Sequence, residues 1–211
     1  MLKPISNKQA NQLILGSLLG DASLNLMNKN PRLQFSHSKA QEEYIWWKYE
    51  LLSESFDLTE PKMIMSGKEK KYPQYRFQTP TTQRLIYYQK LFYPKGKKIL
   101  TRKMLNMLEP LGLAVWYMDD GNIIIHKYTK TDGTKGIKGR ELAINTQCYS
   151  YEEHEIIKRY FEVKWKLEVK IYKNKGSYRI VMNATNAKMF IEIIEAYIIP
   201  SMSYKIDLQY V

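Results

Sequence analysis

The chain has 211 residues, 44% of them hydrophobic, and it carries 33 Lys and Arg against 21 Asp and Glu, a formal net charge of +12. This hydrophobic content excludes wholesale disorder, and the length suits one large domain or two small ones. A single cysteine, Cys148, excludes an internal disulfide framework and favours a reducing compartment. The positive excess favours a polyanionic partner, with a generically basic protein as the alternative.

The first predicted element is an apolar helix that ends in a carboxylate. Residues Ile14–Ala22 read ILGSLLGDA, and Ser6 and Gln9 have the spacing of a capping box at the start of this helix. The apolar run is too short to span a bilayer, and we expect no membrane association. The sequence therefore predicts a buried helix with Asp21 at its end.

Alternating segments follow, and they predict strands with one apolar and one polar face. In RLQFSHS (Arg32–Ser38), Leu33 and Phe35 alternate with polar residues, and YRFQT (Tyr75–Thr79) behaves in the same way. The polar face is suited to contact bases and phosphates, although such a face can also simply contact water. The DNA-contacting residues expected here are Arg32, Gln34, Ser36, Ser38, Gln74, Arg76 and Gln78.

The same pattern begins again 99 positions later. Leu113–Gly121 reads LAVWYMDDG, in which Asp120 corresponds to Asp21, Pro110 suits the first turn of a helix and Gly121 suits its end. Later segments repeat in the same order. We therefore expect two halves, residues 1–95 and 110–211, that are joined by a basic linker over residues 96–109.

The second half contains the corresponding strands and a long basic loop. Segments 141–147 (ELAINTQ) and 178–183 (YRIVMN) answer the strands of the first half, and residues 127–140 form a Gly-punctuated basic hairpin loop. The residues expected to contact DNA in this half are Lys138, Arg140, Asn145, Gln147, Lys170 and Arg179.

The repeated acids indicate a metal site. Two such helices packed side by side would bring Asp21 and Asp120 together, each near the negative end of a helix dipole, which is electrostatically poor without a cation. Carboxylates, backbone carbonyls and water suit Mg²⁺, which can activate water and stabilise a leaving oxygen. For either Asp alone, an ordinary helix-end polar residue would be the better interpretation.

The two nine-residue motifs resemble those of the LAGLIDADG homing endonucleases, and the chain is similar to their monomeric, two-motif, yeast mitochondrial intron-encoded type. NTQCYSYEEHE (Asn145–Glu155) and IPSMSYKI (Ile199–Ile206) support the closer likeness. The resemblance implies an α+β fold of two pseudo-symmetric αββαββα halves whose antiparallel sheets form a saddle-shaped DNA-binding surface. It also implies a monomer that cuts both strands of a long, asymmetric DNA site with 3′ overhangs and requires a divalent metal such as Mg²⁺.

The resemblance also assigns roles to single residues. Asp21 and Asp120 match the metal-binding acids, and the carbonyls of Gly20 and Asp119 are further candidate ligands. Lys205 matches a catalytic lysine after the last helix, and we expect Lys98, or its neighbour Lys97, to be its first-half counterpart.

Three features depart from the family pattern or leave alternatives. The first motif ends in Ala22 in place of Gly. Gln147 fits the polar group expected near the metal in the second half, whereas His37 or Ser36 would serve in the first, and a packed strand residue is the preferred interpretation of His37. The alternative functions are an intron RNA maturase and a catalytically inactive DNA-binding regulator. We expect an intracellular protein, and the Lys-, Ile- and Tyr-rich composition hints at an AT-rich organellar or bacterial genome.

Overall fold

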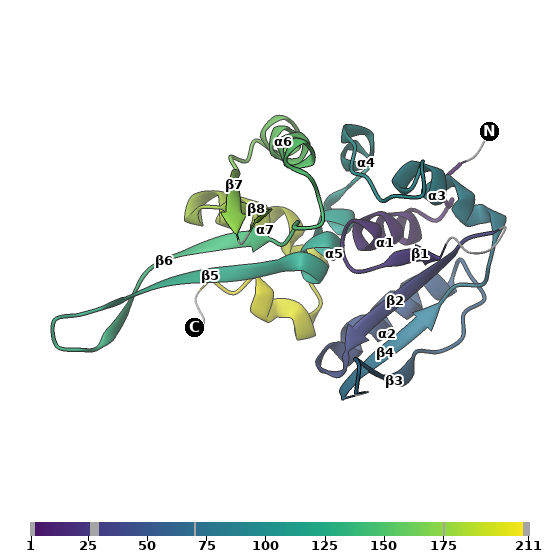
Figure 1. The fold of residues 1–211 in the computed structure, drawn as a ribbon, viewed down its shortest axis with the longest axis horizontal. Coiled ribbons are helices and arrows are strands. Elements are labelled where there is room, and N and C mark those ends of the chain that lie inside the picture. Colours follow the sequence, from purple (N-terminus) through teal and green to yellow (C-terminus); the bar gives the residue numbers. More distant parts are fainter. Residues whose placement is uncertain (1–2, 26–29, 70, 175, 209–211) are drawn as a thin grey trace. The chain divides into compact units, whose positions relative to one another are not determined.

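The computed structural model describes residues 3–25, 30–69, 71–174 and 176–208. The chain forms two compact units, residues 1–99 and residues 100–211. In both units a motif helix precedes two strands, a second helix, two further strands and a third helix (Figure 1). The segment that was expected to join the halves, residues 96–109, contains a short helix of the second unit.

The first unit is a four-stranded antiparallel sheet with helices, in the strand order β1-β2-β4-β3. Short 3₁₀ turns precede its second and third helices. Its elements are α1 (Lys8–Leu19), β1 (Ser23–Asn25), β2 (Arg32–Ser38), α2 (Glu42–Ser53), β3 (Lys62–Ser66), β4 (Tyr72–Gln78) and α3 (Ile86–Phe92).

One face of this sheet is packed under α2. Leu33, Phe35 and Phe77 are at most 2% exposed. The rings of Phe35 and Phe77 stack across β2 and β4 with centroids 4.7 Å apart, and Tyr49 of α2 meets Phe77 edge-on at 5.9 Å. Because side chains alternate along a strand, the polar residues between these apolar ones all lie on the other face.

The second unit repeats this sheet in the strand order β5-β6-β8-β7. A π-helical turn, Phe161–Trp165, and two 3₁₀ segments, Glu195–Tyr197 and Pro200–Lys205, complete it. Its elements are α4 (Arg102–Asn106), α5 (Pro110–Asp120), β5 (Gly121–Thr129), β6 (Lys135–Ile144), α6 (Tyr151–Tyr160), β7 (Lys170–Asn174), β8 (Ser177–Met182) and α7 (Ala184–Ile194).

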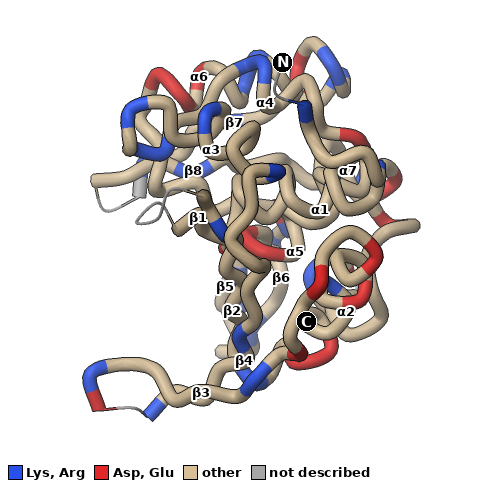
Figure 2. Tube along the Cα trace, turned by 90° about the vertical axis from the view of Figure 1, so that its right-hand side faces the viewer, with Lys and Arg blue, Asp and Glu red and all other residues tan. Residues whose placement is uncertain are grey.

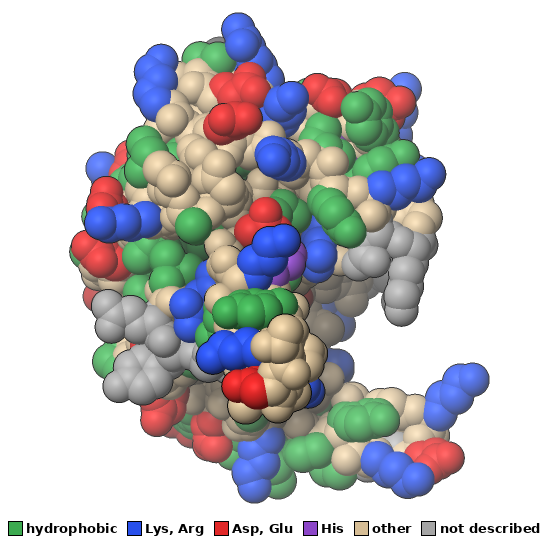
Figure 3. All heavy atoms as spheres, turned by 90° about the vertical axis from the view of Figure 1, so that its left-hand side faces the viewer, with side chains coloured by type: hydrophobic (Ala, Val, Ile, Leu, Met, Phe, Trp, Pro, Cys, Tyr) green, Lys and Arg blue, Asp and Glu red, His purple; other side chains and the backbone are tan. Residues whose placement is uncertain are grey.

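Strands β5 and β6 extend beyond the rest of their sheet as a hairpin (Figure 1). β6 pairs with β5 along its whole length, but it pairs with β8 only over Leu142–Ile144. Near the tip, the ring of Tyr128 covers Gly136, where a Cβ atom would lie 2.6–2.9 Å from ring and hydroxyl atoms. Figure 3 looks onto this end of the chain and shows Lys and Arg side chains beside hydrophobic ones; Tyr128 and Ile137 are 46% and 41% exposed.

Both motif helices are buried because they are apolar on all sides. In α5 every residue from Leu111 to Met118 is buried, and in α1 every residue from Gln12 to Leu19 is buried. The start of α1 differs from the expectation, since Asn7, not Ser6, caps it and accepts a hydrogen bond from the Ala10 N–H at 3.0 Å. Pro110 lies in the first turn of α5, as predicted.

The predicted α+β fold of two similar antiparallel halves is confirmed. Within the described part of the chain, no helix combines the length and the apolar character that a bilayer crossing requires.

Gly121 is required by the close approach of Tyr117. A Cβ atom at this position would collide with the ring and the carbonyl oxygen of Tyr117. We expect Gly121→Ala to lower the free energy of unfolding by about 1–3 kcal/mol or more, measured by urea denaturation, because either the ring or the start of β5 must move. Gly139→Ala is the matched control, since nothing lies within 4 Å of its added Cβ. Equal stability of the two variants would contradict this account.

Candidate functional site

In the first unit, Asp21 lies just beyond the end of a buried helix. The Gly20 N–H closes the last turn of α1 on the Gly16 carbonyl at 3.1 Å, and the Ala22 N–H reaches the Ser17 carbonyl at 2.8 Å. The Asp21 side chain is 46% exposed. The carboxylate is therefore accessible, although the backbone on both sides of it is hydrogen-bonded to the helix.

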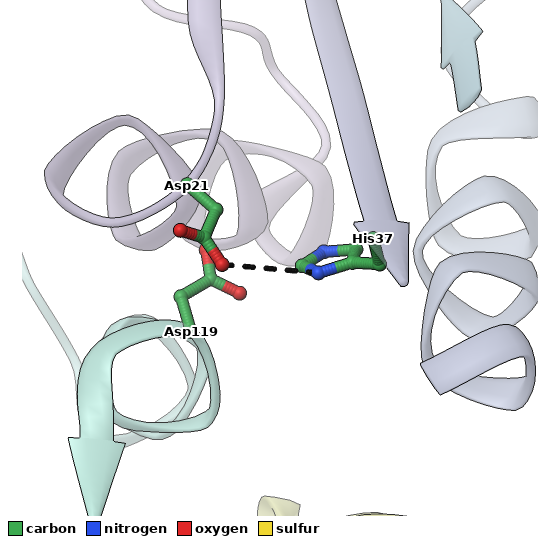
Figure 4. A group of neighbouring side chains, drawn as sticks. All are labelled: Asp21, His37 and Asp119. Atoms are coloured by element: carbon green, nitrogen blue, oxygen red, sulfur yellow. Dashed lines mark ion pairs between the residues drawn. The ribbon is translucent and has the colours of Figure 1, made fainter. Parts of the chain in front are cut away.

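His37 of β2 is packed in the first unit and also lies beside Asp21. Its side chain is 2% exposed, and its ring centroid is 4.8 Å from that of Tyr44 on α2. Its Nδ1 atom lies 3.8 Å from Oδ2 of Asp21 (Figure 4), a separation longer than a hydrogen bond. His37 is therefore a packed strand residue, which was the preferred interpretation. It also lies near the acid, as the alternative interpretation requires.

Lys98 is placed at the end of α1. Its Nζ donates to the carbonyl of Leu19 at 3.4 Å. A cation at a helix C-terminus is stabilised by the unpaired carbonyls and the dipole of the helix. Of the two candidate lysines, the structure therefore brings Lys98 to the end of the motif helix.

Lys205 occupies the corresponding position in the second unit. Its Nζ, in a side chain that is almost fully buried, donates to the carbonyls of Met118 and Asp119, the latter at 3.2 Å. Met118 and Leu19 are 99 positions apart, the same offset that separates the two acids. The two lysines therefore bind equivalent carbonyls, which is evidence that they are counterparts.

Tyr117 holds the backbone of Lys205 in place. Its hydroxyl donates to the carbonyl of Lys205 at 2.6 Å. Burial raises the pKa of the Tyr117 phenol above its ordinary value, so the group remains a protonated donor at physiological pH. The same ring excludes a side chain at residue 121, which explains the glycine at the end of the second motif.

The carbonyl of Asp120, the last residue of α5, is held by Asn145. The backbone N–H and the side-chain Nδ2 of Asn145 both donate to it, at 2.9 and 2.8 Å. Nδ2 also donates to Oδ1 of Asn122 at 2.9 Å, and Gln147 donates to Oδ1 of Asn145 at 3.3 Å. Three amide side chains therefore form a chain of hydrogen bonds that ends at the acid's own backbone.

In the first unit, the polar strand residues share one face of the sheet, which we call polar face 1. Direct pairs across β2 and β4 join Gln34 to Gln78, Ser36 to Arg76 and Ser38 to Gln74. One side-chain hydrogen bond lies within a pair, from Gln78 to Gln34 at 2.7 Å, and another joins neighbouring pairs, from Ser36 to Gln74 at 3.0 Å. The structure thus brings together all seven residues that were expected to contact DNA in this half, and Figure 2 shows basic positions on β3 and β4. They are Arg32, Gln34, Ser36, Ser38, Gln74, Arg76 and Gln78.

In the second unit, the expected DNA-contacting residues are divided. Register places Lys170 and Arg179 on one face, polar face 2, because Lys170 pairs with Val181 and Tyr172 with Arg179. Arg140 pairs with Ile125, so it shares the opposite face of β6 with the buried Leu142. Lys138 lies where the register of the hairpin shifts, and it has no direct partner across β5.

Sequence reasoning missed several residues at these sites. Lys62 pairs with Arg76 on polar face 1, and Tyr172 lies on polar face 2 with its ring 5.3 Å from the Arg179 guanidinium. The short apolar run in KMIMS (Lys62–Ser66), with a polar residue at each end, was an available strand signal for the first. The contact of Tyr117 with Lys205 spans 88 positions and leaves no local signal.

A family model described as the LAGLIDADG DNA endonuclease family matches residues 11–190. The chain is 30% identical over 200 residues to protein RecA of Mycolicibacterium flavescens, covering 92% of this chain but only 45% of that protein, so the chain spans about half the length of such relatives. It is 29% identical to the probable intron-encoded endonuclease 1 of Wickerhamomyces canadensis (95% of this chain, 84% of that protein). It is 27% identical to the cytochrome b mRNA maturase bI2 of Debaryomyces hansenii (97% and 75%).

A solved structure has the same fold. The homing endonuclease I-WcaI, bound to its DNA recognition sequence, matches with a TM-score of 0.82 and 25% identity over 99% of this chain and 89% of that one. With the family model matching most of the sequence and both motif helices ending in an acid, the chain belongs to the LAGLIDADG DNA endonuclease family.

Proposed function

We propose that this protein is a site-specific endonuclease that hydrolyses both strands of a long, asymmetric duplex DNA and leaves 3′ overhangs. The observation that carries the proposal is the repeated carboxylate, Asp21 and Asp120, at the end of a buried helix in each half of a chain from a DNA endonuclease family. The basic composition and the polar sheet faces support a DNA partner.

Asp21 and Asp120 hold divalent cations in this proposal, with Mg²⁺ as the expected ion. The donor chemistry fits, because the Asp21 carboxylate is accessible and hard oxygen ligands suit Mg²⁺. The carbonyls of Gly20 and Asp119 are secondary candidates, and that of Asp119 already accepts a hydrogen bond from Lys205. When bound, the cations lower the pKa of water and stabilise the leaving oxygen.

Lys98 and Lys205 supply positive charge where the phosphate becomes more negative. Each Nζ is oriented by carbonyls at the end of a motif helix, so little rearrangement is needed when charge develops on the scissile phosphate. Polar faces 1 and 2 supply the contacts that bind and select the DNA. Basic hairpin residues, including Lys138 and Arg140, are proposed to contact phosphates. The expectation of DNA contact also included Asn145 and Gln147, and their hydrogen bonds place both near the backbone of Asp120.

A second candidate function is supported by the likeness to a maturase. A protein of this fold could bind intron RNA, alone or in addition to cutting DNA. We propose a monomer, because one chain carries both motifs. An organellar location is suggested by the intron-encoded endonuclease and the cytochrome b mRNA maturase among the relatives.

The first experiment exposes the protein to a randomised duplex library with Mg²⁺ or with EDTA, and sequences the new ends. We expect double-strand breaks with 3′ overhangs at one long motif, only with Mg²⁺. Selective binding without cleavage would instead support an inactive DNA-binding regulator, and neither binding nor cleavage would favour the RNA function.

Replacing either acid should separate binding from cleavage. We expect Asp21→Asn and Asp120→Asn to abolish cleavage of the selected site, because an amide is a poor ligand for Mg²⁺, while the Kd for DNA in EDTA changes little. The measurements are single-turnover cleavage and equilibrium binding. A variant that cuts at the wild-type rate would overturn the assignment of that acid.

Arg76 tests polar face 1, since it lies between Ser36 and Lys62 on neighbouring strands. We expect Arg76→Ala to weaken binding by about 1–3 kcal/mol and to remove the preference at one base position of the selected site. Arg159→Ala, which removes an exposed arginine from α6, is the matched control and should leave the preference intact. An unchanged preference in Arg76→Ala would contradict base contact by this side chain.

A further inference from the structure

Asn145 was expected to contact DNA, but its hydrogen bonds indicate a different task. Helix α5 ends at Asp120 and strand β5 begins at the next residue, so no loop lies between the acid and the sheet. The carbonyl of Asp120 accepts two hydrogen bonds, and both come from Asn145. Asn145, the residue that directly follows strand β6, thus holds the backbone at the point where helix α5 becomes strand β5.

The donors of the Asn145 side chain are already used. An Asn amide has two N–H donors, and those of Asn145 are directed to the Asp120 carbonyl at 2.8 Å and to Oδ1 of Asn122 at 2.9 Å. Its Oδ1 accepts from Gln147. To read a base edge with its N–H groups, Asn145 would have to break its hydrogen bond to the Asp120 carbonyl or its hydrogen bond to Asn122.

We propose that Asn145 is a positioning residue for Asp120 and does not read DNA sequence. Fixing the Asp120 carbonyl fixes the peptide between Asp120 and Gly121, and with it the direction of the Asp120 Cα–Cβ bond. This holds the carboxylate in one place for its cation. The inference rests on the proposed nuclease function, and it gives Asn145 the role of positioning the metal-binding acid of the second half.

The equivalent side chain in the first half has a different partner. In the repeat, RLQFSHS aligns with ELAINTQ, so Ser36 stands where Asn145 stands. The Ser36 hydroxyl donates to Gln74 on polar face 1. The side chain at this position therefore bonds to a residue of polar face 1 in the first half, and it bonds to the backbone of the metal-binding acid in the second.

The test compares Asn145→Ala and Asn145→Leu with Arg179→Ala on polar face 2, on the duplex recovered by selection. Leu is close to Asn in shape but neither donates a hydrogen bond nor binds a cation, so it decides the matter should the Ala variant fail to fold. We expect both Asn145 variants to cut about 10- to 100-fold more slowly under single-turnover conditions, since small misplacements of catalytic groups have effects of this size. They should also need more Mg²⁺ for half-maximal rate, while their Kd for DNA in EDTA stays at the wild-type value.

Arg179→Ala should show the converse, with weaker DNA binding and an unchanged Mg²⁺ midpoint. Wild-type cleavage and Mg²⁺ midpoint in the Asn145 variants, together with weaker binding or a lost base preference, would overturn the proposal. If the wild-type protein cuts no duplex, the nuclease function itself fails. In that case Mn²⁺ binding to the free protein still decides the positioning role, and equal Mn²⁺ affinity of wild type and Asn145→Ala overturns it.

Discussion

The arrangement of both halves depends on the hydrogen bonding at the end of a buried apolar helix, where the chain also carries a carboxylate. The last carbonyls of such a helix have no partners within the helix, and leaving them unpaired in a dry environment is costly. Here Lys98 binds the Leu19 carbonyl, Lys205 binds those of Met118 and Asp119, and Asn145 binds that of Asp120. The groups that satisfy the backbone thus place positive charge and an amide at the ends of the motif helices, where the acids stand in the chain.

The lysines have two compatible effects on this arrangement. A cation offsets the negative end of the helix dipole, and it also offsets the nearby carboxylate. In the second half the lysine is itself held, because the buried Tyr117 hydroxyl donates to the Lys205 carbonyl. The ring of Tyr117 then leaves no room for a side chain at Gly121, so that one tyrosine links the end of the motif helix to the segment that carries the lysine.

The two halves share their element order but differ around their acids. The carboxylate of Asp21 lies 3.8 Å from Nδ1 of the buried His37, whereas the backbone carbonyl of Asp120 accepts hydrogen bonds from Asn145. The sheets differ as well. Polar face 1 carries hydrogen-bonded Ser and Gln side chains on β2 and β4, whereas the sheet of the second unit has Arg140 of β6 and Arg179 of β8 on opposite faces. Two unlike polar surfaces in one chain agree with an asymmetric target, since each half presents different donors and acceptors.

The sequence by itself determined the elements and their faces, because these follow from local periodicity. Apolar runs that end in Asp predicted the motif helices, and strict alternation predicted the members of polar face 1 on β2 and β4, though not Lys62 of β3. Local spacing was less reliable where neighbours compete, as with Ser6 and Asn7 at the first helix cap, or where a hairpin shifts register near Lys138. Only the tertiary structure decided which groups meet across the chain: Lys98 with Leu19, Tyr117 with Lys205, and Asn145 with Asp120. These contacts join residues 25 to 88 positions apart, and they arise from the packing of strands and helices, which no local pattern encodes.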